Sequence, residues 1–283
     1  PVADFSFVAG CLGAQSIFAD LSTVNAPANI NQWTWDFGDL NGSSDQNPAH
    51  QFSSMNSFDV ELVIETADGC KDSITSTIDV YPSPEVDVSA IPECALDAVQ
   101  FTNLSGISAG AIATHNWDFG DLASSAVNVP NHTYSTSGLY TIVYTATSDQ
   151  GCISDTTFAL ASFPNPITEF TATEVCFGEE IELNNTSSVI APGIIDTYEL
   201  DFGDSSPTQN AVPPSYQYEN PGDYVLELIV TTTDGCDDTL EVATVTHNLP
   251  IALFDFTNVC EDDSVLYTDQ SIIPIGTISS WLW

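Results

Sequence analysis

The sequence of 283 residues contains almost no positive charge: one Lys or Arg stands against 40 Asp and Glu, for a formal net charge of −39. Nucleic acids and anionic membrane surfaces bind to clustered cations, so neither is an expected partner. Methionine occurs only once, and strong helix formers are few, which argues against a helical bundle. No apolar run reaches the ~18 residues of a membrane span, and the first residues lack the basic and apolar regions of a signal peptide.

The composition is nevertheless that of a folded protein, because 43% of the residues are hydrophobic and 10% are aromatic. Thr, Ser, Val, Ile, Asn and Gly dominate, which favours strands and turns. Apolar and polar residues alternate in segments such as 224–230, a pattern typical of strands that bury one face. The sequence therefore predicts an all-β fold.

Internal repetition defines the organisation of the chain. Trp-Asp-Phe-Gly-Asp occurs at 35–39 and 117–121, and Leu-Asp-Phe-Gly-Asp occurs at 200–204. Such self-similarity is the signature of a repeat architecture. The fourth repeat stops within its tryptophan strand, so we expect a longer array of which this chain is a part. The predicted units are repeat 1 (1–83), repeat 2 (84–165), repeat 3 (166–249) and a partial repeat 4 (250–283).

Each unit reads as a two-sheet Greek-key sandwich built from about seven short strands. Hairpin dipeptides such as Asp68-Gly69 follow the clearest alternating strand. Gly138 and Gly222 precede their strands by two residues, so we expect a tight turn with positive φ there. The expected core residues of the repeated peptide are Trp35, Phe37, Trp117, Phe119, Leu200 and Phe202.

The repeats resemble PKD (polycystic kidney disease-type) domains, which are immunoglobulin-like β-sandwiches. The resemblance is carried by the opening at 3–7, the repeated Trp-Asp-Phe-Gly-Asp peptide, the segment 47–50, the turn at 138–140 and the closing segment 80–82. It implies tandem sandwiches arranged head to tail as a rod. The paired cysteines further make the chain similar to large surface adhesins of gliding bacteria, exported by the type IX secretion route.

Catalysis is not expected, because the repeats provide internal controls. Every histidine aligns with an aromatic residue of a sister repeat, and neither a general base nor a metal ligand can be exchanged for Phe or Trp. The aspartate pairs recur in every complete repeat, whereas a catalytic site is normally built once. We interpret these aspartates as turn formers. The histidines are His50, His115, His132 and His247, and the pairs are Asp36/Asp39, Asp118/Asp121 and Asp201/Asp204.

Seven cysteines indicate disulfides in an oxidising compartment, because no Cys-x-x-Cys zinc motif is present. In the sandwich implied by the resemblance, the two cysteines of one repeat lie at opposite ends, farther apart than a bridge can span. Head-to-tail stacking favours Cys11–Cys152 and Cys94–Cys236, with the partner of Cys260 outside the chain. Two alternatives stay open: the within-repeat bridges Cys11–Cys70, Cys94–Cys152 and Cys176–Cys236, and the sequential bridge Cys70–Cys94.

The expected function is that of a non-catalytic stalk or spacer in a long, secreted cell-surface adhesin, with a role in gliding motility or surface attachment. The repeats are joined by short proline-bearing segments, which are stiff. The alternatives are a glycan-binding or spacer module of a secreted polysaccharide-degrading enzyme, and a surface-layer repeat. Expected partners are the neighbouring repeats of the same chain, together with surface polysaccharide or other cell-surface proteins.

Two modifications of this acidic surface are also predicted. Calcium would neutralise carboxylates that face each other where repeats meet, because it prefers six to eight hard oxygen ligands; no other cofactor is expected. Asp-Ser/Thr-apolar tripeptides after the second cysteine resemble the acceptors of the O-glycosylation system found alongside type IX secretion. The calcium candidates are Asp39, Asp121, Asp149, Asp155, Asp234, Asp237 and Asp238, and the glycan candidates are Ser73, Thr156 and Thr239.

Overall fold

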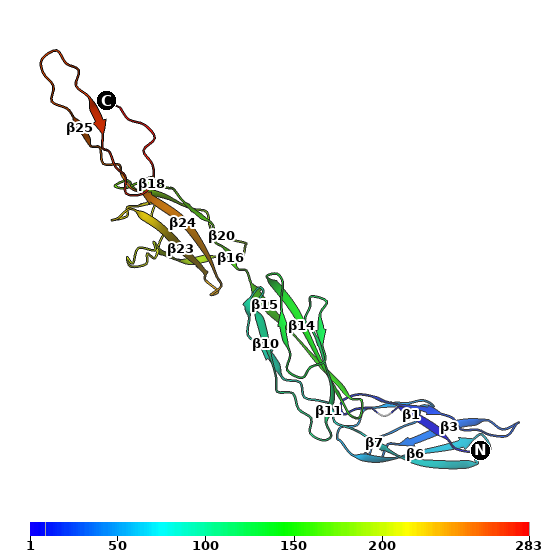
Figure 1. Cartoon of the computed structure of the whole chain (residues 1–283). Coiled ribbons are helices and arrows are strands. Elements are labelled where there is room, and N and C mark those ends of the chain that lie inside the picture. The colour runs from blue at the N-terminus through cyan, green and yellow to red at the C-terminus, as the bar shows by residue number, and fades with distance from the viewer. Residues whose placement is uncertain (9, 283) are drawn as a thin grey trace. The chain divides into compact units, whose positions relative to one another are not determined.

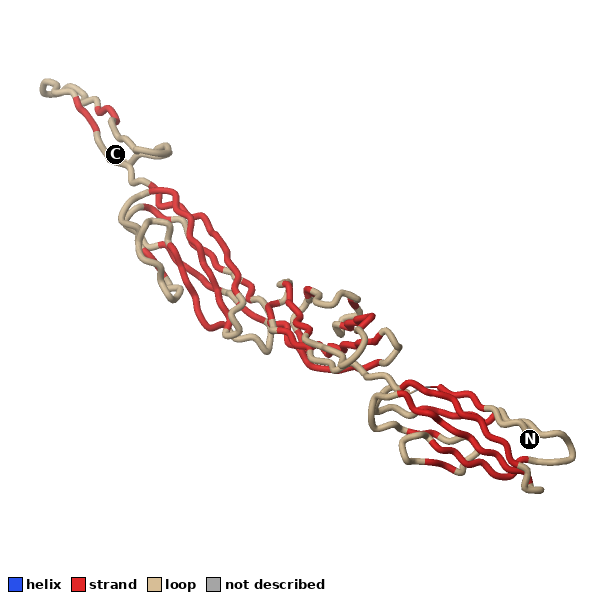
Figure 2. Tube along the Cα trace, turned by 90° about the horizontal axis from the view of Figure 1, so that it is seen from below, coloured by secondary structure: helices blue, strands red, loops and turns tan. Residues whose placement is uncertain are grey.

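The computed structural model describes residues 1–8 and 10–282, and all regular secondary structure within them is strand (Figure 2). The all-β prediction is therefore confirmed. In the same residues no helix is present that could cross a membrane. The chain divides into two compact units, one made of Pro1–Ile91, Ala98–Thr133 and Leu139–Leu160, the other of Pro92–Asp97, Tyr134–Gly138 and 161–282.

Repeat 1 consists of two antiparallel sheets (Figure 1). One sheet has the order β1-β2-β5 and the other β4-β3-β6-β7, so that the repeated Trp-Asp-Phe-Gly-Asp peptide begins on an inner strand of the larger sheet. The strands are β1 (Phe5–Val8), β2 (Ser16–Asp20), β3 (Ile30–Asp36), β4 (Gly42–Ser43), β5 (Ala49–His50), β6 (Ser57–Thr66) and β7 (Lys71–Asp79).

Repeat 2 has the same two-sheet plan, with the orders β13-β10-β8 and β12-β11-β14-β15-β9. The short strand β9 carries Cys94 and pairs in parallel with the end of β15, where Phe163 lies opposite Cys94. The strands are β8 (Val88–Ala90), β9 (Glu93–Cys94), β10 (Ala98–Asn103), β11 (Ile112–Asp118), β12 (Ser124–Ser125), β13 (Asn131–Thr133), β14 (Gly138–Ser148) and β15 (Ile153–Phe163).

Repeat 3 contains sheets ordered β17-β19-β22 and β18-β24-β23-β21, with a separate pair formed by β16 and β20. Its strands are β16 (Pro166–Ile167), β17 (Phe170–Ala172), β18 (Val175–Cys176), β19 (Ile181–Asn185), β20 (Ser188–Val189), β21 (Ile195–Asp201), β22 (Ser215–Tyr216), β23 (Gly222–Thr232) and β24 (Asp237–His247).

The cores form where the sequence alternation places them. In β6 every second residue from Phe58 to Thr66 is buried, so the strand presents one face to the opposite sheet. The repeated peptide supplies the centre of each core, because its two apolar positions are buried in all three repeats. These residues are Trp35, Phe37, Trp117, Phe119, Leu200 and Phe202.

Glycine is required within the repeated peptide, but not at the two other positions where a turn was expected. Gly38 has a φ of 72°, and a Cβ atom there would lie 2.7 Å from the carbonyl oxygen of Asp59. Gly120 has the same relation to Thr141. By contrast, Gly138 and Gly222 are the first residues of β14 and β23. The expectation of positive φ at these two glycines is wrong, because both lie in extended strands, and Gly222 pairs with Thr246 of the neighbouring strand.

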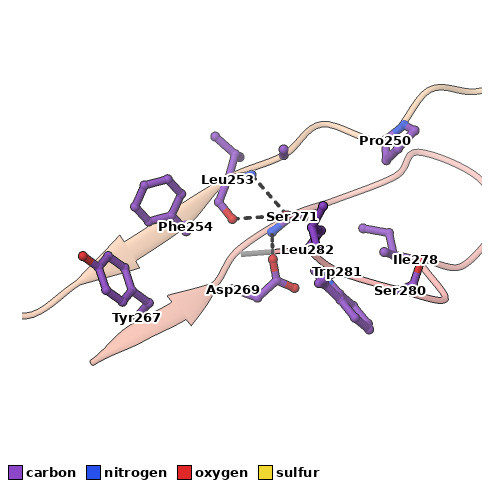
Figure 3. Close-up of a pocket in the computed structure, with 11 residues that line it drawn as sticks. Pro250, Leu253, Phe254, Tyr267, Asp269, Ser271, Ile278, Ser280, Trp281 and Leu282 are labelled. Atoms are coloured by element: carbon purple, nitrogen blue, oxygen red, sulfur yellow. Dashed lines mark hydrogen bonds between the residues drawn. The ribbon is translucent and has the colours of Figure 1, made fainter. Parts of the chain in front are cut away.

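Partial repeat 4 contributes a single two-stranded pair, β25 (Phe254–Phe256) and β26 (Tyr267–Asp269). Figure 3 shows the pocket beside it, where Leu253, Phe254, Tyr267 and Trp281 lie around an open volume of about 720 Å³. Phe254 is 58% exposed, whereas the corresponding Phe5 of repeat 1 is buried. Within 250–282 the structure contains no second sheet to cover this apolar face. The pocket is therefore an uncovered core and not a preformed ligand site; Trp283 lies outside the described residues.

Candidate functional site

The first cysteine of each repeat lies in a turn of recurring geometry, and we call these residues the turn cysteines. The residue two positions later has a positive φ in all four repeats, at Gly13, Leu96, Gly178 and Asp262. In repeats 1 to 3 the residue after the cysteine donates its N–H to a carbonyl at the end of the repeat. These bonds are Leu12 to Tyr81 (2.7 Å), Ala95 to Phe163 (2.8 Å) and Phe177 to His247 (2.8 Å).

The second cysteine of each complete repeat follows a glycine in the last hairpin, and we call Cys70, Cys152 and Cys236 the hairpin cysteines. A buried hydroxyl residue four positions earlier caps each of them. Ser148 Oγ accepts the Cys152 N–H at 3.0 Å, and the Ser148 N–H donates to the Cys152 carbonyl at 2.8 Å. Thr66 and Thr232 make the same two bonds with their own cysteines.

Two disulfides join a turn cysteine to the hairpin cysteine of the next repeat. Cys11 is bonded to Cys152 and Cys94 to Cys236, with Cα–Cα distances of 5.6 and 5.7 Å. Both distances lie within the usual range for a bridge. The within-repeat and sequential alternatives are not formed, and Cys70, Cys176 and Cys260 are free and exposed.

Side-chain bonds also attach two of the proline-bearing joins to the turn cysteine segment. Ser83 Oγ donates to the Leu12 carbonyl at 3.3 Å, and Asn165 Nδ2 donates to the Ala95 carbonyl at 2.8 Å. Neither these residues nor the hydroxyl caps were identified from the sequence. The caps had a visible signal, however, because Ser or Thr stands four residues before each of the three hairpin cysteines.

The paired aspartates of the repeated peptide form its turn. Asp118 Oδ1 accepts the Gly120 N–H at 2.9 Å, and Asp121 Oδ1 accepts the Ala123 N–H at 3.0 Å. The same two bonds are present in repeats 1 and 3. These short-range Asx bonds are typical of turn aspartates.

The second aspartate of each pair also binds the aromatic residue stacked on the neighbouring phenylalanine. His50 Nε2 lies 2.8 Å from Asp39 Oδ2, and its ring stacks on Phe37 with centroids 4.1 Å apart. His132 repeats this arrangement with Asp121 and Phe119. In repeat 3 the position is filled by Tyr216, whose hydroxyl donates to Asp204 at 2.8 Å while its ring stacks on Phe202.

The two remaining histidines also have local partners. His115 Nδ1 lies 2.7 Å from the hydroxyl of Tyr144, and His247 Nε2 lies 3.2 Å from Glu174 Oε2. All four histidines thus occupy positions that a structural role explains.

These hydrogen bonds perturb the second aspartate of each pair. Burial would raise the pKa of Asp39, but bonds from His50 and Asn41 outweigh burial and hold the pKa below its ordinary value of 3.8. Asp121 and Asp204 have lowered pKa values for the same balance of causes. A lowered pKa in the folded state means that the unfolded state binds more protons in acid. These carboxylates contribute their full stabilisation of the folded state at pH values above the ordinary pKa. The contribution is lost as the pH falls through the lowered pKa of the folded state.

We therefore expect the Asp39→Asn and Asp121→Asn variants to lose stability at pH 7, by about 1–2 kcal/mol each, because a charge-assisted bond is lost. Their stability should also decline less steeply than that of the parent chain between about pH 5 and pH 3. Both effects are measured by urea unfolding at several pH values, with hydrogen exchange as the probe of each repeat. Asp68→Asn, in an exposed hairpin, is the charge-matched control and should change little. Parallel pH profiles for all variants would contradict this interpretation.

The predicted calcium grouping is not present. Within 1–8 and 10–282 no three His, Cys, Asp or Glu side chains come together in a way that could hold a metal ion. The physical reason is that several candidates are already engaged: Asp39 and Asp121 bind histidines, and Asp238 Oδ2 accepts the N–H of Thr168 at 2.8 Å. Asp149 lies close to Gly110, and Asp155 is exposed on β15.

Two further calcium candidates, Asp234 and Asp237, line a cleft of about 410 Å³ beside the Cys94–Cys236 bridge. Glu93 and Asp97 provide the other acidic side chains of its lining. The predicted approach of Asp121 to these residues stays a prediction.

Comparison with protein-family models identifies the repeated unit. The family model described as PKD domain matches residues 1–82, 81–161 and 164–247, which together make up most of the chain. The chain belongs to the PKD domain family. PKD domains are typically non-catalytic modules, and both they and disulfides are typical of extracellular proteins.

The solved structures that are similar to this chain include two single PKD domains and one three-domain fragment. The PKD1 domain of Vibrio anguillarum Epp is 26% identical, with a TM-score of 0.28, and the match covers 29% of this chain and 96% of that domain. The PKD1 domain of the Vibrio cholerae metalloprotease PrtV is 27% identical, with a TM-score of 0.27, and covers 29% and 98%. Three N-terminal domains of the bacteriophage RB49 outer capsid protein Hoc match at 11% identity and a TM-score of 0.37, covering 87% and 96%.

The tryptophans of the PKD repeats are positioned for packing. Trp35 Nε1 donates to the Asp45 carbonyl at 2.9 Å and Trp117 Nε1 to the Val127 carbonyl at 3.1 Å, so both indoles are anchored in the core. Trp33 is half-buried, and its Nε1 donates to Asp20 at 2.7 Å. Trp281 is exposed because repeat 4 is uncovered. An aromatic platform for stacking sugars needs exposed ring faces, which Trp35 and Trp117 do not provide.

Proposed function

We propose that these PKD repeats are a non-catalytic spacer within a long, secreted cell-surface adhesin that serves surface attachment or gliding motility. The observation that carries the proposal is the covalent bridge between successive repeats, from a turn cysteine to the hairpin cysteine of the next. A module whose task is to transmit force or hold a distance benefits from bridged joints. A module that only binds a ligand does not require them.

The composition of the joins and of the surface supports the same proposal. Pro82 and Pro84, and Pro164 and Pro166, place two prolines within three residues of each other, which limits the conformations of the join. The net charge of −39 keeps neighbouring molecules apart and favours solubility.

The proposal is tested on intact cells of the source organism. Antibodies raised against the chain should label unpermeabilised cells, and protease added outside should remove the label. Deleting whole repeats from the native protein should weaken attachment or gliding progressively. Label seen only after permeabilisation would overturn the proposal.

A glycan-binding role is the competing function, and it is separated by a direct measurement. The oxidised chain should show no saturable binding in pull-downs with insoluble and soluble polysaccharides. Two results together would favour the competing function. One is saturable polysaccharide binding that is lost when a surface side chain is substituted, and the other is cell attachment that persists after repeats are deleted.

The proposed export route also carries a glycosylation prediction, now refined by the strand geometry. Ser73 and Thr239 are exposed on β7 and β24, whereas Thr156 is half-buried on β15. The difference arises because Asp155 lies three residues after its hairpin cysteine and the other acceptor aspartates lie two residues after theirs. One extra residue moves a side chain to the other face of a strand. The three sites are therefore not equivalent, although their shared sequence motif had suggested that they would be.

We expect native protein to carry O-glycans on Ser73 and Thr239 and none on Thr156. Glycopeptide mass spectrometry of protein purified from the source organism measures all three positions at once. Sugar on Thr156 with Ser73 and Thr239 bare would contradict the prediction, and a complete absence of sugar would remove glycosylation from the proposed function.

A further inference from the structure

In repeat 2 the two bridged cysteines lie at opposite ends of the strand β15. Cys152 stands directly before its first residue, Ile153, and Cys94 lies opposite its last residue, Phe163, in the parallel pairing with β9. The Ala95 N–H donates to the Phe163 carbonyl at 2.8 Å and holds this end in place. A pull between the bridge to repeat 1 and the bridge to repeat 3 is therefore directed along one strand.

The two bridges close loops that overlap along the chain. Cys11–Cys152 has a sequence separation of 141 residues and Cys94–Cys236 one of 142. Cys94 lies inside the first loop and Cys152 lies inside the second, so the segment 94–152 belongs to both. Three backbone segments therefore connect one bridge with the other. They are 11–94, 94–152 and 152–236, with lengths of 83, 58 and 84 residues.

The shortest of these segments limits how far the two bridges can separate. A fully extended residue spans at most about 3.5 Å, so the segment 94–152 becomes taut when the bridges are about 200 Å apart. The two longer segments are then still slack. Without the bridges, Cys11 and Cys236 are 225 residues apart along the chain (236 − 11) and can separate by about 790 Å. The bridges therefore withhold about three-quarters of this length, even from a chain in which every core has unfolded.

Both bridges are sheltered from reductants while the repeats are folded. Cys152 is 0% exposed and Cys236 is 1% exposed, and their partners Cys11 and Cys94 are half-buried. A thiolate that reduces a disulfide must reach one of its sulfur atoms, so the rate of reduction depends on access. Reduction is therefore slowed as long as the repeats stay folded.

We propose that the two overlapping bridges are an extension stop, which limits how far a pulled chain can lengthen. Tension passes through the first bridge, back along the segment 94–152 of repeat 2, and through the second bridge. The two longer segments stay outside the load path. This inference goes beyond the spacer function, because it describes how the chain responds to force on whichever surface it is displayed.

The test measures the contour length of single full-length molecules, pulled through peptide tags without Lys or Arg at their two ends. Cys70→Ser/Cys176→Ser/Cys260→Ser removes the free thiols, which would otherwise exchange with the bridges, and is the background for all variants. Dithiothreitol removes both bridges from this background: each S–S bond becomes two thiols, and the reagent is oxidised to its cyclic disulfide. Peptide mapping under non-reducing conditions confirms the bridges before pulling. The variants that lack one bridge are Cys11→Ser/Cys152→Ser and Cys94→Ser/Cys236→Ser.

The reduced chain should extend to about 990 Å, since all 283 residues lie in its path. Each variant with a single bridge should reach only about 490 Å, and the chain with both bridges about 400 Å. The second bridge thus shortens the chain far less than the first, because the two loops overlap. A chain with both bridges that extends as far as the single-bridge variants would overturn the proposal, as would a length that does not change on reduction. The contour length does not depend on the stability of a repeat, so a destabilised variant stays informative.

Lys71 allows an independent test of the load path. It is the only Lys or Arg in the sequence, its side chain is 62% exposed, and it lies in the segment 11–94. Trypsin cleaves after Lys or Arg, so it can cut this chain only once. Because the segment 11–94 stays outside the proposed load path, the chain with both bridges should remain tethered under force after the cut.

The single-bridge variants distinguish this result from incomplete cleavage. Cys11→Ser/Cys152→Ser and the reduced chain should break at the cut, because no bridge spans Lys71 in either of them. Cys94→Ser/Cys236→Ser is the matched control and should survive, because its remaining bridge spans Lys71. Reducing gels confirm in each case that the cut has been made. Rupture of the cut chain with both bridges would show that the load runs through the segment 11–94 and would overturn the proposal.

Discussion

Trp117→Ala should destabilise repeat 2 strongly while repeats 1 and 3 keep their stability. The indole is 0% exposed, its ring centroid lies 5.1 Å from Phe101 and 4.5 Å from Tyr144, and its N–H donates to the Val127 carbonyl. Removing a buried tryptophan costs about 3–5 kcal/mol in lost burial and cavity formation. A domain of this size is stable by only about 4–12 kcal/mol, so the loss is a large fraction of its stability.

Repeat 3 suggests the milder variant of the same experiment. Leu200 occupies the equivalent position and is 0% exposed, so the fold accepts leucine at this point when the surrounding residues are adjusted to it. Trp117→Leu should therefore destabilise repeat 2 by less than Trp117→Ala, because it retains part of the buried volume. Leu122→Ala is the matched control: this leucine is 104% exposed on the same turn, and its truncation should change stability by less than about 0.5 kcal/mol.

Hydrogen exchange read by mass spectrometry assigns the loss to a repeat. Amides of β11, β14 and β15 should lose protection in Trp117→Ala, while those of β6 and β23 retain it. Loss of protection spread evenly over all three repeats, or a change as small as that of Leu122→Ala, would show that Trp117 is not the centre of an independent core.

The features that could be predicted from sequence are those that local pattern determines. The alternation of apolar and polar residues along β6 specifies a strand with one buried face. The repeated Trp-Asp-Phe-Gly-Asp peptide specifies a core position and a glycine turn within a few residues of each other. The structural role of His50 and His132 was also readable, because Tyr216 fills the same position in repeat 3. Their bonds to Asp39 and Asp121 were not predicted.

The features that could not be predicted depend on register or on long-range geometry. The face of Thr156 follows from a one-residue difference that changes its side of the strand. The predicted calcium ligands were grouped by assuming how neighbouring repeats stack on each other. In the structure, Asp238 accepts the N–H of Thr168 at the start of repeat 3, and Asp121 binds His132. The extended backbone at Gly222 results from its pairing with Thr246, a partner that no local pattern specifies.

Removing the Cys11–Cys152 bridge should destabilise repeat 1 strongly without changing its fold. The bridge ties repeat 1 to repeat 2 across a sequence separation of 141 residues. When repeat 1 unfolds alone, folded repeat 2 holds both Cys152 and the join at Pro84, so the unfolded segment from Cys11 to Pro84 is closed into a loop. The chain-entropy relation gives about 4 kcal/mol for a loop of this length.

The Cys11→Ala/Cys152→Ala variant measures this contribution without leaving a reactive thiol at the joint. Hydrogen exchange of the amides in β3 and β6 monitors the unfolding of repeat 1. The denaturant midpoint of repeat 1 in this variant should fall well below that of the parent chain. Reduction of the parent with dithiothreitol should produce a comparable shift. Cys70→Ala is the matched control, because Cys70 is free and exposed and belongs to the same repeat, and its midpoint should stay unchanged.

The result separates two roles for the bridge. A large shift in repeat 1, with protection in repeat 3 unaffected, means that the bridge limits the freedom of the unfolded repeat. An unchanged midpoint in both the variant and the reduced parent would mean that the bridge adds nothing to the folding equilibrium. Recovery of a Cys11–Cys70 peptide from the oxidised parent would overturn the pairing itself, and with it the argument that successive repeats are joined covalently.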